Sequence, residues 1–159
     1  IGVFACSAVM NGVWLFEMTK LSLPVALGRE SEEVFLTQRE PNYRVFRHVN
    51  QHLPEDSRIL LQGIVKGFYC ERPYLWDHPH QSVIEYDHYE TATDLRRRFD
   101  ELGITHVVRM IRIPPGRESL GFPQYFMDAY HEEFRKRHLK LLYRDESYVL
   151  FEVASAGKG

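Results

Sequence analysis

Cysteine is scarce in this sequence, and neither sign of charge is in surplus. The two cysteines, Cys6 and Cys70, lie far apart and lack CxxC or Cys/His spacing, so neither a zinc site nor a disulfide framework is indicated. The 20 basic and 22 acidic residues leave a formal net charge of −2. Nucleic-acid binding needs a concentrated positive surface, so nucleic acid is not an expected partner.

Complete catalytic motifs are also missing. The sequence contains no GxSxG elbow, no HExxH helix motif and neither glycine fingerprint of nucleotide-binding loops. Cys70 is accompanied only by distant histidines, a combination that a chain of this size shows by chance. The sequence therefore identifies no catalytic residue, and it requires no cofactor.

What is present is typical of a folded protein, with 44% hydrophobic and 26% charged residues. A chain of 159 residues accommodates one ordinary domain and an appendage. We expect the domain to cover residues 41–153, between a lead-in and a flexible tail at 154–159.

The lead-in begins at Ile1 rather than at Met, and its first 16 residues carry no charged side chain. A spanning helix needs about 20 predominantly apolar residues. We therefore interpret residues 1–22 as an apolar helix, the end of a transmembrane span that begins upstream, with Trp14, Phe16 and Lys20 at the membrane interface. A buried helix is the alternative, as is a signal peptide, which the missing basic n-region disfavours.

Residues 23–40 are predicted to form a connector. Pro24 and Gly28 are expected to break any continuing helix, and the Ser31 hydroxyl then caps a short helix that ends near Arg39.

Alternating helical and strand patterns occupy the rest of the chain. Thr93 is expected to cap a helix that ends at Gly103, where glycine enters the left-handed region at little cost. The periodicity predicts helices over 41–53, 93–103 and 124–138, a short helical piece over 68–71, strands over 57–63, 73–76 and 104–110, and a terminal β-hairpin of 139–143 and 148–153.

This pattern predicts a small Rossmann-like three-layer α/β sandwich, preceded by the apolar helix. Its sheet would be mostly parallel, with helices on both faces and the antiparallel hairpin at one edge. Ligands bind such sheets beyond the carboxyl ends of the strands, so a site is expected in the loops 63–72, 77–90 and 111–123.

The turn after the first strand is one candidate, because backbone amides at Gly63 and Gly67 would be able to cradle a phosphate. Only Asp77 supplies an acidic residue after the second strand, and the glycine fingerprint is missing. A tight structural turn is the alternative interpretation.

The loop 77–90 is the second candidate, because it offers the oxygen and imidazole ligands that divalent metals use. Pro79 separates two of its histidines, and solvated loop histidines are the alternative. The candidate metal ligands are His78, His80, Asp87 and His88, with Asp77 and Glu90 beside them.

A series of segments carries a resemblance to a known family. They are the connector GRESEE, a helix ending in HLPED, the strand RILLQG, the segment GFYCERPY, the step ELGITHVV and the closing strand YVLFEV. Their order, after an apolar span, resembles the carboxyl-terminal soluble domain of bacterial polytopic membrane glycosyltransferases. These belong to the C-type fold group, which includes the dolichyl-phosphate-mannose protein mannosyltransferases and the aminoarabinose transferase of lipid A. The resemblance covers residues 28–153.

The resemblance implies a domain outside the cytoplasm, attached to the last spanning helix of an enzyme that moves a sugar from a polyprenyl-phosphate carrier to an acceptor. The catalytic acid of those enzymes lies in an early outer loop that this sequence does not contain, so no catalytic residue is carried over. The family's turn after the first strand corresponds to Gly63, Gly67, Tyr69, Arg72 and Pro73, which would form a contact surface.

Our leading hypothesis is therefore a non-catalytic accessory domain of a membrane glycosyltransferase-like protein, on the periplasmic or extracellular side, with the membrane and a lipid-linked sugar or acceptor as partners. The alternative is a free-standing Rossmann-like domain that binds a metal or small ligand through residues 77–90. A purely structural domain on the outer face of a membrane protein is a third possibility.

Overall fold

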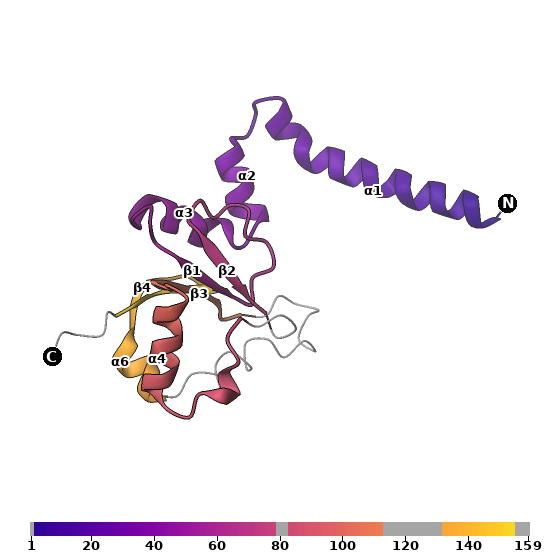
Figure 1. Cartoon of the computed structure of the whole chain (residues 1–159). Coiled ribbons are helices and arrows are strands. Elements are labelled where there is room, and N and C mark those ends of the chain that lie inside the picture. Colours follow the sequence, from indigo (N-terminus) through magenta and orange to yellow (C-terminus); the bar gives the residue numbers. More distant parts are fainter. Residues whose placement is uncertain (1, 79–82, 113–131, 155–159) are drawn as a thin grey trace. The chain divides into compact units, whose positions relative to one another are not determined.

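Two units, Ile1–Pro41 and Asn42–Gly159, make up the chain (Figure 1). The computed structural model describes residues 2–78, 83–112 and 132–154. The first unit contains the helices α1 (Gly2–Ala26) and α2 (Glu32–Arg39). All five described strands belong to the second unit.

Helix α1 extends beyond the predicted break at Leu23-Pro24, which corrects that expectation. Pro24 lies in the last turn of the helix, where its missing N–H removes one hydrogen bond without ending the helix. The chain leaves the helix at Gly28, whose φ of 66° is left-handed. Within the part of the chain that the structure describes, no helix combines the length and the apolar character that crossing a bilayer requires.

Helix α2 confirms the predicted cap. Ser31 has extended backbone angles, and its hydroxyl accepts a hydrogen bond from the Val34 N–H at 3.3 Å. Glu32 and Glu33 in the first turn and Arg39 in the last turn match the polarity of the helix dipole.

The sheet confirms a mixed α/β fold that is parallel where it begins. Its order is β2-β1-β3-β5-β4, in which β1 (Ile59–Gln62) pairs in parallel with both β2 (Tyr74–Asp77) and β3 (His106–Met110). The last two strands, β4 (Leu139–Arg144) and β5 (Tyr148–Val153), form the predicted antiparallel hairpin, with a register shift between Leu141 and Tyr143.

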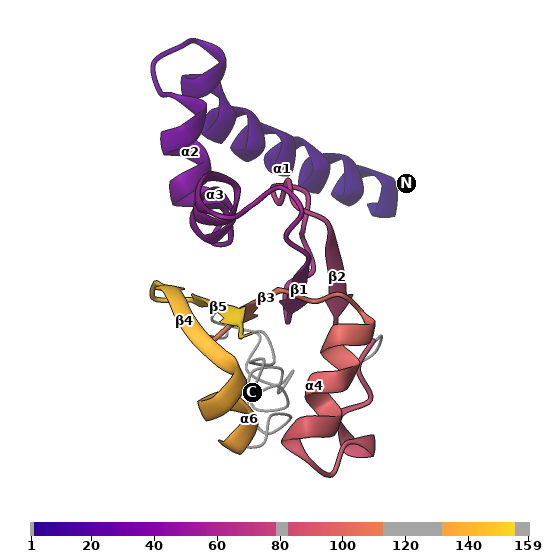
Figure 2. The same cartoon turned by 60° about the vertical axis from the view of Figure 1, so that its left-hand side comes forward.

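Helices cover both faces of this sheet, as the sequence predicted. Helix α3 (Tyr43–His52) lies on one face, and α4 (Ala92–Glu101) and α6 (Glu132–His138) lie on the other (Figures 1 and 2). Alternate residues of β1 face opposite ways, so Ile59 and Leu61 pack on α3 while Leu60 packs with α4 and α6. The largest fully buried side chains of the helices are Phe46, Phe99 and Phe134, one from each.

The cap of α4 corrects a detail of the prediction. Thr91, not Thr93, is the N-cap residue, and its hydroxyl accepts a hydrogen bond from the Asp94 N–H at 3.1 Å. The Thr91 hydroxyl also donates to the Asp94 carboxylate, so the pair resembles a capping box. At the other end, Gly103 has a φ of 65°, as predicted.

The segments between the sheet strands differ in part from the prediction. The short helix predicted over 68–71 is a turn, closed by the hydrogen bond from Cys70 N–H to Gly67 O at 2.9 Å. The loop 77–90 contains the single turn η1 (Tyr86–His88), a 3-10 helix. The loop predicted after β3 and the start of the helix predicted over 124–138 lie outside the described residues, which resume at 132.

Candidate functional site

Three polar residues lie side by side at the carboxyl ends of the parallel strands. The register pairs Gln62 of β1 with Asp77 of β2 on one side and with Arg109 of β3 on the other. Gln62 and Asp77 are the last residues of β1 and β2, and Arg109 is the next-to-last residue of β3. Each lies two positions after a residue that packs on the side of the sheet covered by α4. The parallel topology therefore places a carboxylate, an amide and a guanidinium in one row, at the edge where ligands of such sheets bind.

Tyr86, from the turn η1, completes this group. Its hydroxyl donates to Asp77 Oδ2, and the Gln62 amide donates to the same oxygen at 3.2 Å and also to the Tyr86 hydroxyl. On the other side, Arg109 Nε donates to Gln62 Oε1 at 3.1 Å. We call these four residues the polar row.

The polar row is almost wholly removed from solvent. Gln62 is 0%, Asp77 1%, Arg109 4% and Tyr86 5% exposed. Burying a charge is costly unless the charge is paired and hydrogen-bonded, and here the amide of Gln62 connects one negative group to one positive group. The Arg109 guanidinium also lies 5.9 Å from the centre of the Phe151 ring, a cation–π distance.

The chemistry of the row is that of a buried hydrogen-bond network, not of an acid or base exposed to solvent. Its hydrogen bonds hold β1, β2, β3 and the turn η1 together at one end of the sheet. The sequence prediction included Asp77 but missed Gln62, Tyr86 and Arg109. The sequence signal for these residues was a polar side chain at or near the end of each predicted parallel strand.

The predicted contact residues of the loop 63–72 have structural roles. Gly63 has a φ of 72°, which suits the turn after β1. Gly67 lies so close to the Tyr74 ring that a Cβ atom at this position would come within 2.7 Å of it, so only glycine fits here without a shift. Tyr69 packs edge-on against Tyr43 with the ring centroids 5.3 Å apart.

Arg72 and Asn50 fasten the same loop to the end of α3. The Arg72 guanidinium donates to the carbonyl oxygens of Asn50 at 2.7 Å and of Leu53 at 3.0 Å, which satisfies carbonyls that a helix terminus leaves without intrahelical partners. The Asn50 side chain donates to Tyr69 O and accepts from the Glu71 N–H. This anchoring leaves two large apolar side chains of the loop exposed, Val65 and Phe68, each at 65%.

The metal hypothesis receives no support from the described residues, where no group of three or more His, Cys, Asp or Glu side chains converges. His78 is half-buried, and His88 pairs with Glu85 at 2.7 Å on the surface. His80 and the Asp87 side chain lie outside the described residues and side chains.

Burial shifts the pKa of several groups. The pKa of the Cys70 thiol is raised, mainly by burial, so the thiol is poorly suited to act as a nucleophile. Burial lowers the pKa of His48, His106 and His138 below the ordinary value of 6.5, with the neighbouring His52 contributing at His48. These three imidazoles therefore prefer the neutral form in the folded protein.

We predict that Tyr86→Phe lowers the free energy of unfolding by about 1.5–3 kcal/mol, because the change removes a buried hydrogen bond to a carboxylate. Urea denaturation would measure the difference. Tyr43→Phe is the matched control, since Tyr43 is half-buried and its ring contact with Tyr69 does not use the hydroxyl. Equal stabilities of the wild type and Tyr86→Phe would show that the row does not hold the turn η1.

The lowered histidine pKa values predict a loss of stability in acid. Between the folded pKa and the unfolded value of about 6.5, the unfolded chain binds more protons, so the free energy of unfolding decreases as the pH falls through that window. Denaturation midpoints at about pH 7.5 and 5.5 measure the effect. His106→Gln should weaken the pH dependence, and an unchanged pH dependence in this variant would contradict the assignment.

Among the described residues, the carboxyl ends of the parallel strands therefore carry two candidate sites, the polar row and the loop 63–72. The chain matches no known protein-family model and no curated protein sequence.

Proposed function

We propose that this chain is a non-catalytic extracytoplasmic accessory domain, held at a membrane by α1, of a glycosyltransferase-like protein that uses polyprenyl-phosphate-linked sugar. The observation that carries the proposal is the distribution of apolar side chains on α1. Consecutive residues from Val13 to Phe16 are each about 60% exposed: Val13 58%, Trp14 63%, Leu15 62% and Phe16 65%.

Four consecutive helical residues point in directions about 100° apart, so these side chains surround the helix on all sides. Met10, one turn earlier, is 68% exposed. A water-exposed helix usually confines apolar residues to one stripe, whereas a helix that is apolar all round is normally covered by protein or lipid. Trp14 is a side chain that favours the membrane–water interface. Lipid is therefore the proposed environment of this part of α1.

The second unit would then be the accessory domain. Its core has two layers of buried side chains, one on each face of the sheet. Support for an accessory rather than a catalytic role comes from the polar row, whose Asp77 carboxylate is occupied by Tyr86 and Gln62 inside the fold.

The loop 63–72 is the surface that we propose to meet the lipid carrier or the acceptor. It follows β1 at the carboxyl edge of the sheet, and α3 holds its backbone through Asn50 and Arg72. A fixed backbone that displays Val65 and Phe68 loses little conformational entropy when a partner covers those side chains. The segment GFYCERPY, which carries part of the family resemblance, forms most of this loop.

The membrane part of the proposal predicts a specific fluorescence change. The sequence has two tryptophans, so Trp76→Phe leaves Trp14 as the reporter and Trp14→Phe leaves Trp76. Emission from Trp14 should shift to shorter wavelength when phosphatidylcholine vesicles are added, and brominated lipid should quench it. Trp76, the control, should respond much less. Trp14 emission that stays unchanged with vesicles and remains open to quenching by iodide in water would refute membrane insertion.

The glycosyltransferase part of the proposal predicts that the gene encodes further membrane spans before this domain. Upstream of Ile1 we expect several apolar spans, with an acidic residue in the first outer loop. A hydropathy profile of the complete open reading frame is the measurement. A start codon within a few residues of Ile1 would instead favour a small domain with its own anchor.

A further inference from the structure

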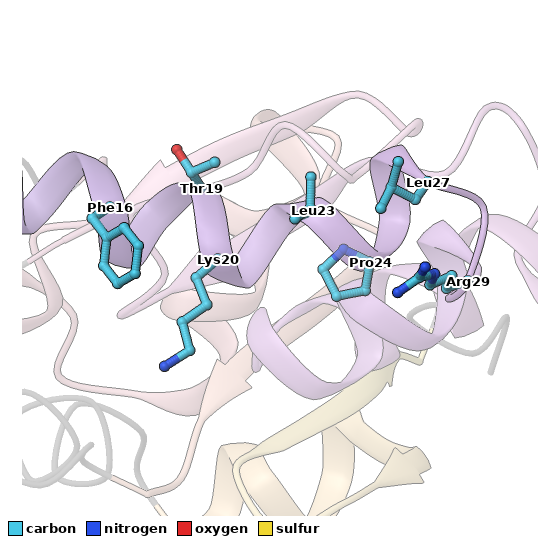
Figure 3. Close-up of a pocket in the computed structure, with 7 residues that line it drawn as sticks. All are labelled: Phe16, Thr19, Lys20, Leu23, Pro24, Leu27 and Arg29. Atoms are coloured by element: carbon cyan, nitrogen blue, oxygen red, sulfur yellow. The ribbon is translucent and has the colours of Figure 1, made fainter.

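A shallow hollow of about 250 Å³ lies beside the last turns of α1 (Figure 3). It belongs entirely to the first unit. Apolar side chains form most of its wall, and a lysine and an arginine complete it: Phe16, Thr19, Lys20, Leu23, Pro24, Leu27 and Arg29.

Helical spacing explains why these residues meet. Phe16, Lys20 and Leu23 follow one another at intervals of three or four residues, so they lie along one side of α1. Leu27, just after the helix, continues this side because its N–H still donates to Leu23 O at 2.9 Å. After the helix, the left-handed Gly28 reverses the chain, and the Arg29 N–H donates to Pro24 O at 2.8 Å. The reversal returns Arg29 to the proline, so one cation of the hollow lies within the row of helical residues and the other at its far end (Figure 3).

Both cations are available to an external anion. Lys20 and Arg29 are exposed, and within the described residues neither takes part in an ion pair. The acidic residues nearest in sequence are Glu17, one turn before Lys20, and Glu30. The apolar wall is exposed as well, since Phe16 is 65%, Leu23 47% and Leu27 56% exposed.

We propose that this hollow binds an anionic phospholipid, a step that rests on the proposed membrane attachment of α1. The lipid phosphate lies between Lys20 and Arg29, and the first part of an acyl chain covers Phe16, Leu23 and Leu27. The paired cations complement the phosphate, whereas the apolar wall would gain nothing from an inorganic ion. A lysine on an apolar helix also extends its ammonium group towards the headgroups while its stem stays on the apolar surface.

The test is binding of the whole chain to two kinds of vesicle, one of pure phosphatidylcholine and one with a quarter of phosphatidylglycerol. Two basic residues near a negative membrane surface together correspond to roughly 30-fold tighter binding. We expect that preference for the anionic vesicles in the wild type. Lys20→Gln with Arg29→Gln should abolish the preference and leave binding to phosphatidylcholine unchanged.

Lys136→Gln with Arg137→Gln is the matched control, because it removes the same charge from two exposed residues far from the hollow in sequence. Their ion pairs with Glu132 and Glu133 lie on the surface, where such pairs contribute little to stability. The control should retain the full preference for anionic vesicles.

Four outcomes would overturn the lipid site. Equal binding of the wild type to both vesicles refutes it while leaving the membrane attachment intact. A control variant that loses as much preference as the Lys20 and Arg29 variant shows a diffuse charge effect instead. Release from anionic vesicles by excess inorganic phosphate shows that the phosphate group alone is recognised. A wild type that binds neither vesicle refutes both the site and the proposed attachment.

Discussion

The fold of the second unit depends on how one glutamine amide is placed between two buried opposite charges. Gln62 ends the central parallel strand, accepts from Arg109 on one side and donates to Asp77 on the other. An amide has both a donor and an acceptor end, so it is able to bridge a carboxylate and a guanidinium that are two strands apart. Without it, the Asp77 carboxylate would lose one of its donors and Arg109 Nε its acceptor, and a buried hydrogen bond to a charged group is worth about 1.5–3 kcal/mol.

The two units differ in where their apolar side chains lie. The second unit hides its apolar side chains between a sheet and helices, and it hides a few charges with them. In the first unit, α1 displays apolar side chains on every side between Val13 and Phe16, and its one cation, Lys20, lies closer to the end where the chain reverses. Apolar side chains on such a helix are stabilised when a non-aqueous surface covers them, which is the physical basis for proposing a lipid environment.

Local chemistry predicted most elements correctly, and long-range contacts account for what it missed. The cap at Ser31, the left-handed Gly103 and the terminal hairpin each follow from residues that are close in sequence. The polar row joins strands as much as 47 residues apart, so no local pattern contained it. The predicted cap at Thr93 was two residues late, because the reciprocal hydrogen bonds between Thr91 and Asp94 identify Thr91 as the N-cap residue.

The hydrogen bond between Tyr86 and Asp77 fixes both ends of a loop across nine positions of sequence. Once such ends are closed, lengthening the segment between them is cheap, since doubling a flexible loop costs only about 0.6 kcal/mol in closure entropy. The strand ends and the turn η1 are therefore compatible with an insertion between them, provided that Ile84, which is fully buried, keeps its place in the core. In evolutionary terms, an insertion at this position would therefore signify tolerance and not a change of fold.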